Sequence, residues 1–459
     1  MNITKAKNNT STHAVIIGGS ITGLLSARVL AEFFSKVTII DSDELCDEPI
    51  PRKGVAQSVQ PHVLLVKGYR ILEELFPGIG EELQVNGALP IDWAQEFFRL
   101  VPDVGWGAIA ESPSEFISYT CSRPLLEWII RKRVAKLANV CWLDRHRVTG
   151  LVCNHEKKIT GALLYQVGKT KEKIEEASLV VDASGRRSLA PKWLEKLGFN
   201  CPPETVINPF LGYATRRYKK NEDLAFEGKV MLIPQVPPHN KRLGYLARIE
   251  NGEWIATLGG YGQDFPPIDE HGFLKFARNL PNSKFYELIK DAEPISPIYA
   301  YRATANRLRH YEKIQLPLGF IVLGDAVCAL CPVYGQGLTV SSLAALVLRS
   351  CLEKRKNWSK DGYFLSSEFQ KELAKSNFPH WDVATVQDSA FASTYPSIQK
   401  QGALNKFIQW YSQKFILGTV LFPELNVLFI GITNLVISPL RLFSPKIIFK
   451  ILMAKFIKF

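Results

Sequence analysis

The segment that most constrains the fold is a short apolar strand, followed by a glycine turn and a helix, near the start of the chain. Residues 14–17 are Ala-Val-Ile-Ile, residues 18–23 are Gly-Gly-Ser-Ile-Thr-Gly, and residues 24–34 have the pattern of a helix. Residues 37–40 then form a second apolar run that ends at Asp41. This order of strand, turn, helix and strand predicts a β-α-β unit.

The residue types in this turn suit a dinucleotide. Such turns need a first glycine for the bend, a second small residue where the backbone meets the pyrophosphate, and a third where helix and strand pack closely. Gly18, Ser20 and Gly23 occupy these positions, with Gly19 between them and Ser20 in place of the usual middle glycine. The Ser20 hydroxyl can bond a phosphate, and the helix N-terminus attracts negative charge. Asp41 lies where an acidic residue binds ribose hydroxyls.

A second glycine-bearing segment follows the apolar residues 179–181. It reads Asp182-Ala183-Ser184-Gly185. The Asp182 carboxylate can accept hydrogen bonds from backbone N–H groups or from a ribose, and Gly185 allows close approach of a cofactor. Taken alone, the segment fits a plain turn at a strand end equally well.

The third segment is the most specific. Gly324 and Asp325 close the apolar strand 319–323, and Asp325 is placed to bind a ribityl chain or a ribose. Residues 332–337, which include Pro332, Gly335, Gln336 and Gly337, then precede a predicted helix from residue 338. A helix N-terminus there would stabilise negative charge on the N1–C2=O edge of a reduced flavin. The order and spacing of the three segments predict an FAD-dependent oxidoreductase.

The rest of the pattern predicts an α/β (α+β) architecture. A Rossmann-like FAD-binding domain would occupy residues 1–200 and 306–360. Residues 201–305 are rich in β-branched and aromatic residues with Gly and Pro breaks, and predict an inserted antiparallel-sheet substrate domain. Residues 361–459 predict a helical region that is both apolar and basic. Within the first domain, residues 141–153 and 159–168 predict a β-hairpin.

At these residues the chain resembles the flavoprotein monooxygenases of the para-hydroxybenzoate hydroxylase type, over roughly residues 14–350. Within that group it is similar to bacterial FAD-dependent epoxidases of polyether biosynthesis, which act on long polyene chains. The segments that carry this likeness are Arg52-Lys53-Gly54-Val55 with Gln57 and His62, Ser122-Arg123 with Leu125, Leu126 and Trp128, Tyr213-Ala214-Thr215-Arg216, Gly324-Asp325-Ala326-Val327 and Pro332-Val333-Tyr334-Gly335.

The resemblance implies a set of cofactor contacts. Arg52, with its neighbour Lys53, and Arg123 would contact FAD, with Arg123 near the ribityl-pyrophosphate region, and residues 332–337 would face the isoalloxazine ring. It also implies a monooxygenase that forms a flavin peroxide, inserts one oxygen atom by epoxidation or hydroxylation, and uses NAD(P)H, directly or through a separate flavin reductase. No catalytic side chain and no metal site are predicted, and His62 is only a weak candidate for a base.

Other functions on the same fold stay open. A flavin-dependent prenyl-chain reductase, or a lipid carrier without turnover, would keep much of the same pattern. A halogenase is disfavoured, because the segment nearest to a Trp-x-Trp-x-Ile-Pro signature is Gly105-Trp106-Gly107-Ala108-Ile109. Cys328 and Cys331 form a C-x-x-C pair that suggests a redox dithiol, but nothing else in the sequence indicates a second redox couple.

Charge and hydropathy point to a lipophilic substrate and away from nucleic acid. The formal net charge is +12, and residues 400–459 carry eight Lys or Arg residues against Glu424 alone, a local excess of +7. Cations among apolar residues suit either a solvated basic face or peripheral contact with an anionic membrane. The uncharged stretch 425–440 is shorter than the roughly 20 residues needed to span a bilayer. We expect a cytoplasmic protein, with the inner face of a membrane as its alternative place.

Overall fold

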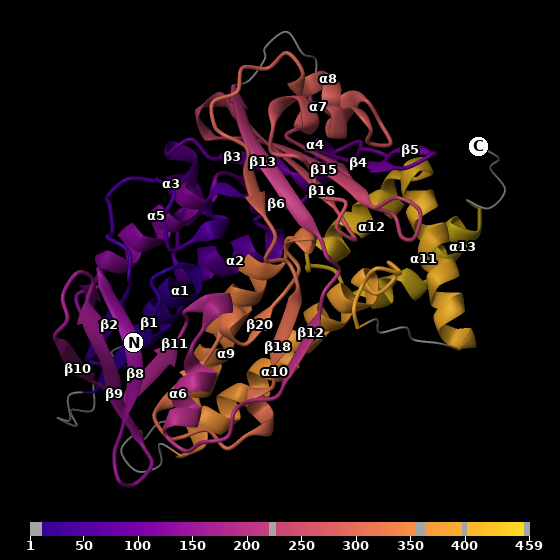
Figure 1. Cartoon of the computed structure of the whole chain (residues 1–459). Helices are drawn as coiled ribbons and strands as arrows, with labels where there is room; N and C mark the ends of the chain where they lie inside the picture. Colours follow the sequence, from indigo (N-terminus) through magenta and orange to yellow (C-terminus); the bar gives the residue numbers. More distant parts are fainter. Residues whose placement is uncertain (1–11, 220–225, 355–362, 397–401, 454–459) are drawn as a thin grey trace, which may run out of the picture.

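A five-stranded parallel sheet forms the core of one half of the molecule (Figure 1). Its strands are, in spatial order, β19 (Phe320–Val322), β11 (Leu179–Asp182), β1 (His13–Ile17), β2 (Lys36–Ile40) and β7 (Val140–Leu143). Every neighbouring pair is parallel. The strands are apolar runs because both faces of such a sheet are covered. The computed structural model describes residues 12–219, 226–354, 363–396 and 402–453.

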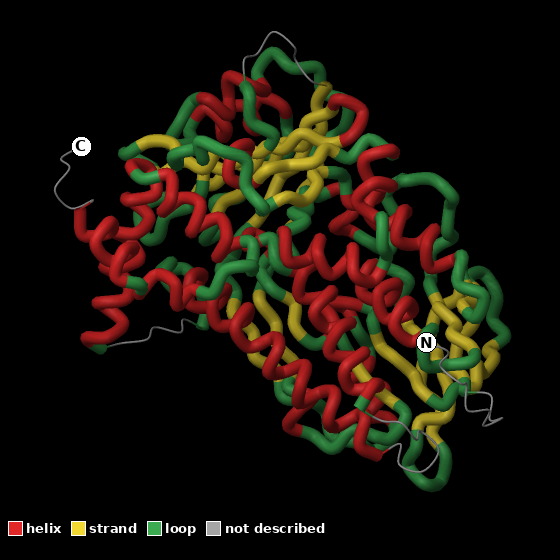
Figure 2. Tube along the Cα trace, turned by 180° about the vertical axis from the view of Figure 1, so that it is seen from behind, coloured by secondary structure: helices red, strands yellow, loops and turns green. Residues whose placement is uncertain are grey.

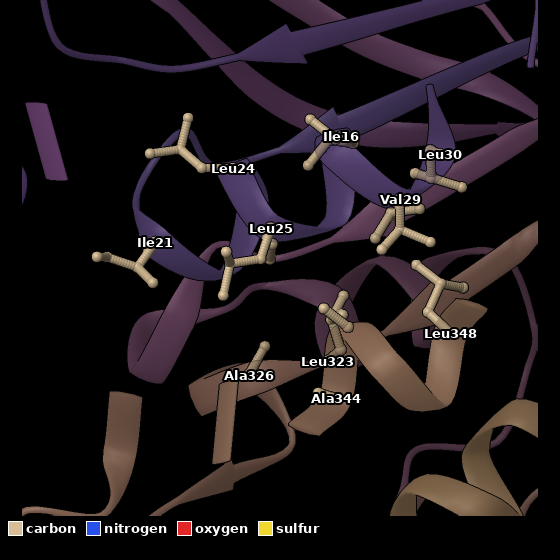
Figure 3. Packing of buried hydrophobic residues seen from close by; sticks show 14 of the residues in the cluster. Ile16, Ile21, Leu24, Leu25, Val29, Leu30, Leu323, Ala326, Ala344 and Leu348 are labelled. Carbon is tan, nitrogen blue, oxygen red and sulfur yellow. The ribbon is translucent and has the colours of Figure 1, made fainter. Parts of the chain in front are cut away.

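Helices and a second, smaller sheet cover this core. The helices α1 (Ile21–Leu30), α5 (Arg123–Ala135) and α9 (Gly337–Glu353) pack together, and α1 is buried between β1 and α9. Figure 3 shows Leu25 and Val29 of α1 on the side of the late residues Leu323, Ala344 and Leu348, all within one hydrophobic core. Leu25 is fully buried, so Leu25→Ala would cost about 2–5 kcal/mol. The antiparallel sheet β8 (His146–Cys153), β9 (Ile159–Gln166) and β10 (Glu172–Glu176) also packs on the parallel sheet.

One expectation about this half is wrong in detail. The predicted hairpin begins five residues later than residue 141, at β8, and pairs β8 with β9 as expected. Residues 140–143 are instead the separate strand β7, which pairs in parallel with β2 at the edge of the main sheet. Arg145, with φ 54°, turns the chain between the two strands. A short apolar run fits a parallel or an antiparallel neighbour equally well, so periodicity alone did not separate them.

The second half is built on a seven-stranded sheet. Its spatial order is β17 (Tyr299–Tyr301), β13 (Gly212–Lys219), β16 (Glu253–Gly260), β15 (Arg242–Ile249), β14 (Val230–Ile233), β4 (Phe97–Val101) and β5 (Gly105–Trp106). The helices α7 (Glu270–Arg278) and α8 (Lys284–Ile289) cover one face through a separate hydrophobic core. The other face of the sheet turns toward the first half of the molecule.

Two of these strands come from outside the predicted insertion. β4 pairs in parallel with β14, with Phe97 opposite Val230, and β5 extends the sheet beyond β4. The range predicted for the substrate domain, residues 201–305, therefore omits the two strands at one edge of the sheet, which come from residues 97–106. This pairing joins segments more than a hundred residues apart, and no local pattern encodes it.

Shorter elements connect the two halves. They are α2 (Val66–Leu75), α3 (Ile79–Val85), β3 (Leu89–Asp92) with β6 (Ile117–Thr120), α4 (Trp93–Glu96), α6 (Ala190–Lys196), and the small sheet β12 (Glu204–Ile207), β18 (Asn306–Arg309) and β20 (Cys328–Ala329). Short 3-10 turns lie at residues 185–187, 324–326 and 332–334.

The C-terminal region is helical, as predicted. α10 (Tyr363–Asp388) packs along α9 and reaches β19 and β18, while α11 (Ala403–Leu421), α12 (Pro423–Thr433) and α13 (Pro445–Met453) form a group at the far edge of the second sheet. Figures 1 and 2 show this group protruding at one side of the molecule. Ile430 of α12 packs with Trp93 and Ile255. Within the described ranges, no helix combines the length and hydropathy that crossing a membrane requires.

Candidate functional site

The three glycine-bearing segments meet at the carboxyl ends of β1, β11 and β19. A Cβ atom on Gly18 would lie 2.7 Å from the carbonyl oxygen of Ala183, and one on Gly324 would lie 2.6 Å from the Thr22 methyl group. The Thr22 and Ser341 hydroxyls are 3.0 Å apart, which connects α1 to the N-terminal part of α9. The sequence prediction that these distant segments share one place in the fold is confirmed.

The turn after β1 requires its glycines. Gly18 has φ 103°, and its N–H donates to the carbonyl of Ile40. A Cβ on Gly23 would lie 1.8 Å from the Gly18 carbonyl oxygen, so only glycine lets α1 start this close to the strand. Among the residues that the structure describes, no side chain caps α1, which leaves the N–H groups of its first turn available to an anion.

A buried network of charges adjoins this turn. Arg52 Nη2 lies 2.6 Å from Asp41 Oδ2, and Arg52 Nη1 lies 2.7 Å from Glu127 Oε1. Asp41 Oδ2 also accepts a 2.8 Å hydrogen bond from the Gly19 N–H. The predicted ribose-binding carboxylate of Asp41 is thus oriented by the glycine turn itself and by a cation. Lys53, the neighbour of Arg52, is exposed.

Glu127 joins Arg123 to this network. Ser20 Oγ donates to Glu127 Oε2 at 2.7 Å and accepts from Arg123 Nη2 at 2.9 Å. Burial raises the pKa of Glu127, but Arg123 and Arg52 outweigh burial and leave that pKa below its ordinary value. Glu127 is therefore an anion that sets the position of both arginines. Sequence analysis missed it, although the spacing of Arg123 and Glu127 on one helix face was a usable signal.

Asp182 shapes its own turn. Its Oδ1 accepts from the Ser184 N–H at 2.9 Å and from the Ser184 hydroxyl, and its Oδ2 accepts from the Ser188 hydroxyl. The sequence left open whether Asp182 bonds groups of the protein or a ribose, and the structure favours groups of the protein. Gly185 has φ 80°, and no atom lies within 4 Å of the place where its Cβ would stand. The turn therefore borders open space.

Asp325 has a different environment. Gly324 has φ 65° and sets the bend after β19. No hydrogen bond reaches the Asp325 carboxylate from the part of the chain that the structure describes. Burial raises the pKa of Asp325, and the charges of Arg186 and Arg123 oppose that effect. Asp325 thus offers an acceptor in the space between the three segments.

The segment 332–337 leads into α9. Pro332 is exposed, Gly335 has φ 64°, and a Cβ on Gly335 would lie 3.1 Å from Val63. The α9 helix begins at Gly337 without a side-chain cap, and a Cβ on Gly337 would meet no atom within 4 Å. Gln336 Oε1 lies 3.0 Å from Nδ1 of His380 in α10. The N-terminus of α9 thus faces open space, and Gln336, the residue before the helix, is held by its contact with His380.

His62 directly precedes Val63, the residue that Gly335 approaches. Its Nδ1 is 3.0 Å from the Gln60 carbonyl oxygen. Burial and the nearby Arg123 lower the pKa of His62 to about 3, so its imidazole is neutral at physiological pH. A neutral, buried imidazole with this hydrogen bond fits a packing role better than a role as a base.

A buried carboxylate supports the segment from the C-terminal region. Asp388, in the last turn of α10, accepts hydrogen bonds from Tyr334 at 2.6 Å, from Tyr261 at 3.0 Å and from Asn306 at 2.6 Å. Burial raises the pKa of Asp388, and these three donors act in the opposite direction. The cluster connects α10, the second sheet and the segment 332–337. Sequence analysis did not identify it.

The inner face of the second sheet meets the segment with aromatic and hydroxyl side chains. Thr215 Oγ1 lies 2.6 Å from Gln60 Oε1 and 2.7 Å from Thr257 Oγ1. Tyr213 packs with Tyr301 and Cys331, and its buried hydroxyl has no hydrogen-bond partner among the described residues. Burial raises the pKa of Tyr213 well above its ordinary value, so the phenol remains a neutral donor.

The C-x-x-C pair lies against the same cluster. Cys328 and Cys331 are both buried, free thiols. Burial raises the pKa of each thiol above its ordinary range. Because the thiolate is the reactive form, this environment works against a redox dithiol.

Comparison with solved structures identifies the class of fold. The brominase Bmp2 has a TM-score of 0.64 with 14% identity, over 97% of this chain and 99% of that chain. The halogenase CmlS gives 0.66 with 14% identity, over 91% and 76%. PqsL from Pseudomonas aeruginosa, a probable FAD-dependent monooxygenase, gives 0.61 with 14% identity, over 83% and 96%. The fold is thus that of FAD-dependent monooxygenases and flavin-dependent halogenases.

A curated relative defines the family more closely. Protein Rv3254 of Mycobacterium tuberculosis is 32% identical over 391 residues, which cover 83% of this chain and 81% of that protein. The chain belongs to the family of Rv3254. No family model matches the sequence.

Proposed function

We propose that this protein is an FAD-dependent monooxygenase that inserts one oxygen atom into a lipophilic polyene, terpenoid or polyprenyl substrate. The observation that carries the proposal is the meeting of three cofactor-type segments near Asp325 and the N-terminus of α9 at Gly337. Among the described residues, the Asp325 carboxylate has no hydrogen-bond donor and the helix N-terminus has no side-chain cap. A carrier that only holds lipid has no use for this combination.

The residues present fit FAD. The uncapped N-terminus of α1 and the Arg123 guanidinium suit the pyrophosphate, and Asp41 suits the adenosine ribose. Asp325 suits the ribityl hydroxyls, and the open space at Gly337 suits the ring, whose reduced form would be stabilised by the positive end of α9. When bound, FAD supplies the two-electron chemistry that activates O₂.

The protein's own contribution is to bind and orient the substrate and to exclude water. The side chains between the sheet and the segment are mainly aromatic and aliphatic, which suits an apolar chain. The neutral Tyr213 hydroxyl can donate to an oxygen of the substrate or cofactor. In the proposed reaction, alkene, O₂, NAD(P)H and H⁺ give epoxide, NAD(P)⁺ and water; hydroxylation uses the same co-reactants. NAD(P)H acts directly or through a separate flavin reductase.

A halogenase is the second candidate, since halogenases are among the structures with this fold. Against it, Trp106 lies in β5 at the opposite edge of the sheet from β17 and β13. Gly107, which follows it, adjoins Asn426 of α12 rather than the segment 332–337. A flavin-dependent prenyl-chain reductase shares every proposed cofactor contact and differs in needing no O₂.

The test begins with the purified chain and added FAD. Visible absorption under nitrogen, before and after NADPH, reports whether flavin binds and whether it is reduced. Geranylgeraniol in detergent is then supplied as a probe alkene with ¹⁸O₂ and a flavin reductase, with bromide present. A product carrying one ¹⁸O supports the proposal. A brominated product, a saturated product that contains no ¹⁸O, or a chain that binds no FAD would overturn it in favour of halogenase, reductase or carrier respectively.

A further inference from the structure

The protruding C-terminal group exposes many large apolar side chains. We call this the C-terminal apolar surface. Its members lie on α11, on the 3-10 turn η7 (Pro439–Phe443) and on α13, and Leu440 is 77% and Phe449 65% exposed. The surface consists of Phe407, Ile408, Trp410, Leu440, Phe443, Phe449, Leu452 and Met453. Scattered exposed apolar residues are ordinary, but a clustered set indicates an interaction site.

Ring contacts join two of the three elements into one patch. The Phe407 and Tyr411 rings stack with centroids 6.0 Å apart, and Tyr411 stacks on Phe443 at 5.5 Å. The Tyr411 hydroxyl also donates to the Leu442 carbonyl. The α13 helix packs against both α11 and η7, so its outward residues continue the same surface. Figures 1 and 2 both show α11 and α13 on the same protrusion.

The helix α13 is apolar on two sides, whereas a helix on a water-exposed surface usually has one apolar side, facing the core. Its inward side chains, Ile447, Ile448 and Ile451, pack against α11 and α12. Its outward side chains, Phe449, Leu452 and Met453, contribute to the C-terminal apolar surface. One side of α13 therefore packs in the protein's own core, and its other apolar side is exposed and available to a partner.

The positive charge of the C-terminal region indicates which kind of partner fits the C-terminal apolar surface. Lys414, Arg441 and Lys446 lie on the same three elements as the apolar residues. Residues 400–459 carry eight cations and one acid, an excess of +7. That acid, Glu424, is paired with Lys450. A second copy of this chain would bring the same positive charge to the contact and repel it. An anionic bilayer supplies both an apolar layer and negative headgroups.

We propose that the C-terminal apolar surface docks this protein on anionic lipid bilayers, with α13 and η7 lying in the interface rather than across it. The attachment has a definite orientation relative to the second sheet. Arg99 of β4 stacks on Phe429 of α12, and Asn426 donates to the Ala108 carbonyl just after β5. The bilayer would therefore lie beside the β4–β5 edge. This inference does not depend on the redox chemistry proposed above.

The test is flotation of the full-length chain with vesicles of phosphatidylcholine alone or with phosphatidylglycerol. We expect binding to the anionic vesicles at low salt and weaker binding at high salt. Arg441→Gln with Lys446→Gln should reduce partitioning about 25-fold, since each basic residue near a membrane contributes about fivefold. Phe449→Ser with Leu452→Ser should reduce it by at least about tenfold.

The matched control places the same chemical change elsewhere. Val85→Ser with Ile174→Ser removes two exposed apolar side chains that lie on α3 and β10. It should leave flotation unchanged, and unchanged melting temperatures for both apolar pairs would exclude misfolding. Absence of flotation at low salt, or equal loss in the control, would overturn the proposal. A concentration-dependent dimer that Phe449→Ser dissociates, without any vesicle binding, would overturn it in favour of a second copy.

Discussion

The Tyr334 hydroxyl donates a 2.6 Å hydrogen bond to Oδ1 of Asp388, across 54 residues of chain. Tyr334 belongs to the segment that leads into α9, and Asp388 ends α10 of the C-terminal region. Tyr261, from the end of β16, donates to the same oxygen. The Asp388 carboxylate therefore connects three parts of the fold beside the candidate flavin site. Its burial raises its pKa, which makes protein stability depend on pH.

We predict that Asp388→Asn makes stability less dependent on pH. Burial raises the folded pKa of Asp388 above its unfolded value. A raised carboxyl pKa contributes stability below the unfolded value, near pH 4, and that contribution is lost as pH rises through the folded pKa. The unfolding free energy of the natural chain, relative to Asp388→Asn, should thus fall as the pH rises above about 4.

Urea unfolding of both proteins across this range checks the prediction. The exposed carboxylate of Asp291 provides the control, because Asp291→Asn changes the same group at the surface. A difference between Asp388→Asn and the natural chain that stays constant with pH would contradict the assigned burial effect.

Tyr213→Phe should stabilise the protein while impairing substrate handling. The Tyr213 hydroxyl is buried without a partner among the described residues, and such a group costs about 1–3 kcal/mol. Its removal should raise the melting temperature. If the hydroxyl instead binds substrate or cofactor, turnover or KM should worsen in the same variant.

Tyr311→Phe is the matched control for this change. Tyr311 is 1% exposed and lies in the core of the first half, and its hydroxyl also lacks a hydrogen-bond partner in the described part of the chain. Both variants should be stabilised, and only Tyr213→Phe should alter turnover of the probe alkene. Equal turnover in the two variants would rule out a substrate or cofactor role for Tyr213.

Arg52→Met should be strongly destabilising. Arg52 pairs with both Asp41 and Glu127, and all three side chains are largely buried. Removing Arg52 leaves buried Asp41 without a cationic partner among the described residues and leaves Glu127 with Arg123 as its remaining cation. Breaking a buried ion pair in this way costs about 3–5 kcal/mol. Urea unfolding at pH 7 measures this loss. Arg52→Met combined with Glu127→Gln should recover part of it, and a single-variant loss below about 1 kcal/mol would contradict the network.

The backbone of the first half was predictable because its signals are local. The run before Gly18, the helix from residue 21 and the cap at Ser122 all lie within short windows, and Ser122 does accept from the Leu125 N–H. The β4–β14 pairing and the position of β7 were not predictable, because short strands choose their neighbours through tertiary packing.

The same distinction holds for the candidate site. Motif glycines were predictable because steric limits restrict these positions to glycine, as the 1.8 Å approach at Gly23 shows. Glu127 could have been inferred from its spacing to Arg123. Asp388 could not, since nothing around it in α10 indicates burial, and its partners come from Tyr261, Asn306 and Tyr334.

Substitutions at Gly337 should separate cofactor binding from folding. Gly337 starts α9 with ordinary helical geometry, and a Cβ there meets no atom within 4 Å. Gly337→Ala and Gly337→Leu should therefore leave the melting temperature of the flavin-free protein unchanged or raise it, because glycine is a poor helix former. If the ring occupies that space, the Kd for FAD should increase with side-chain size, by at least about tenfold for leucine, which corresponds to about 1.4 kcal/mol. Fluorescence titration with FAD measures the Kd. By contrast, Gly23→Ala should prevent folding of the turn, and an unchanged FAD Kd in Gly337→Leu would place the ring elsewhere.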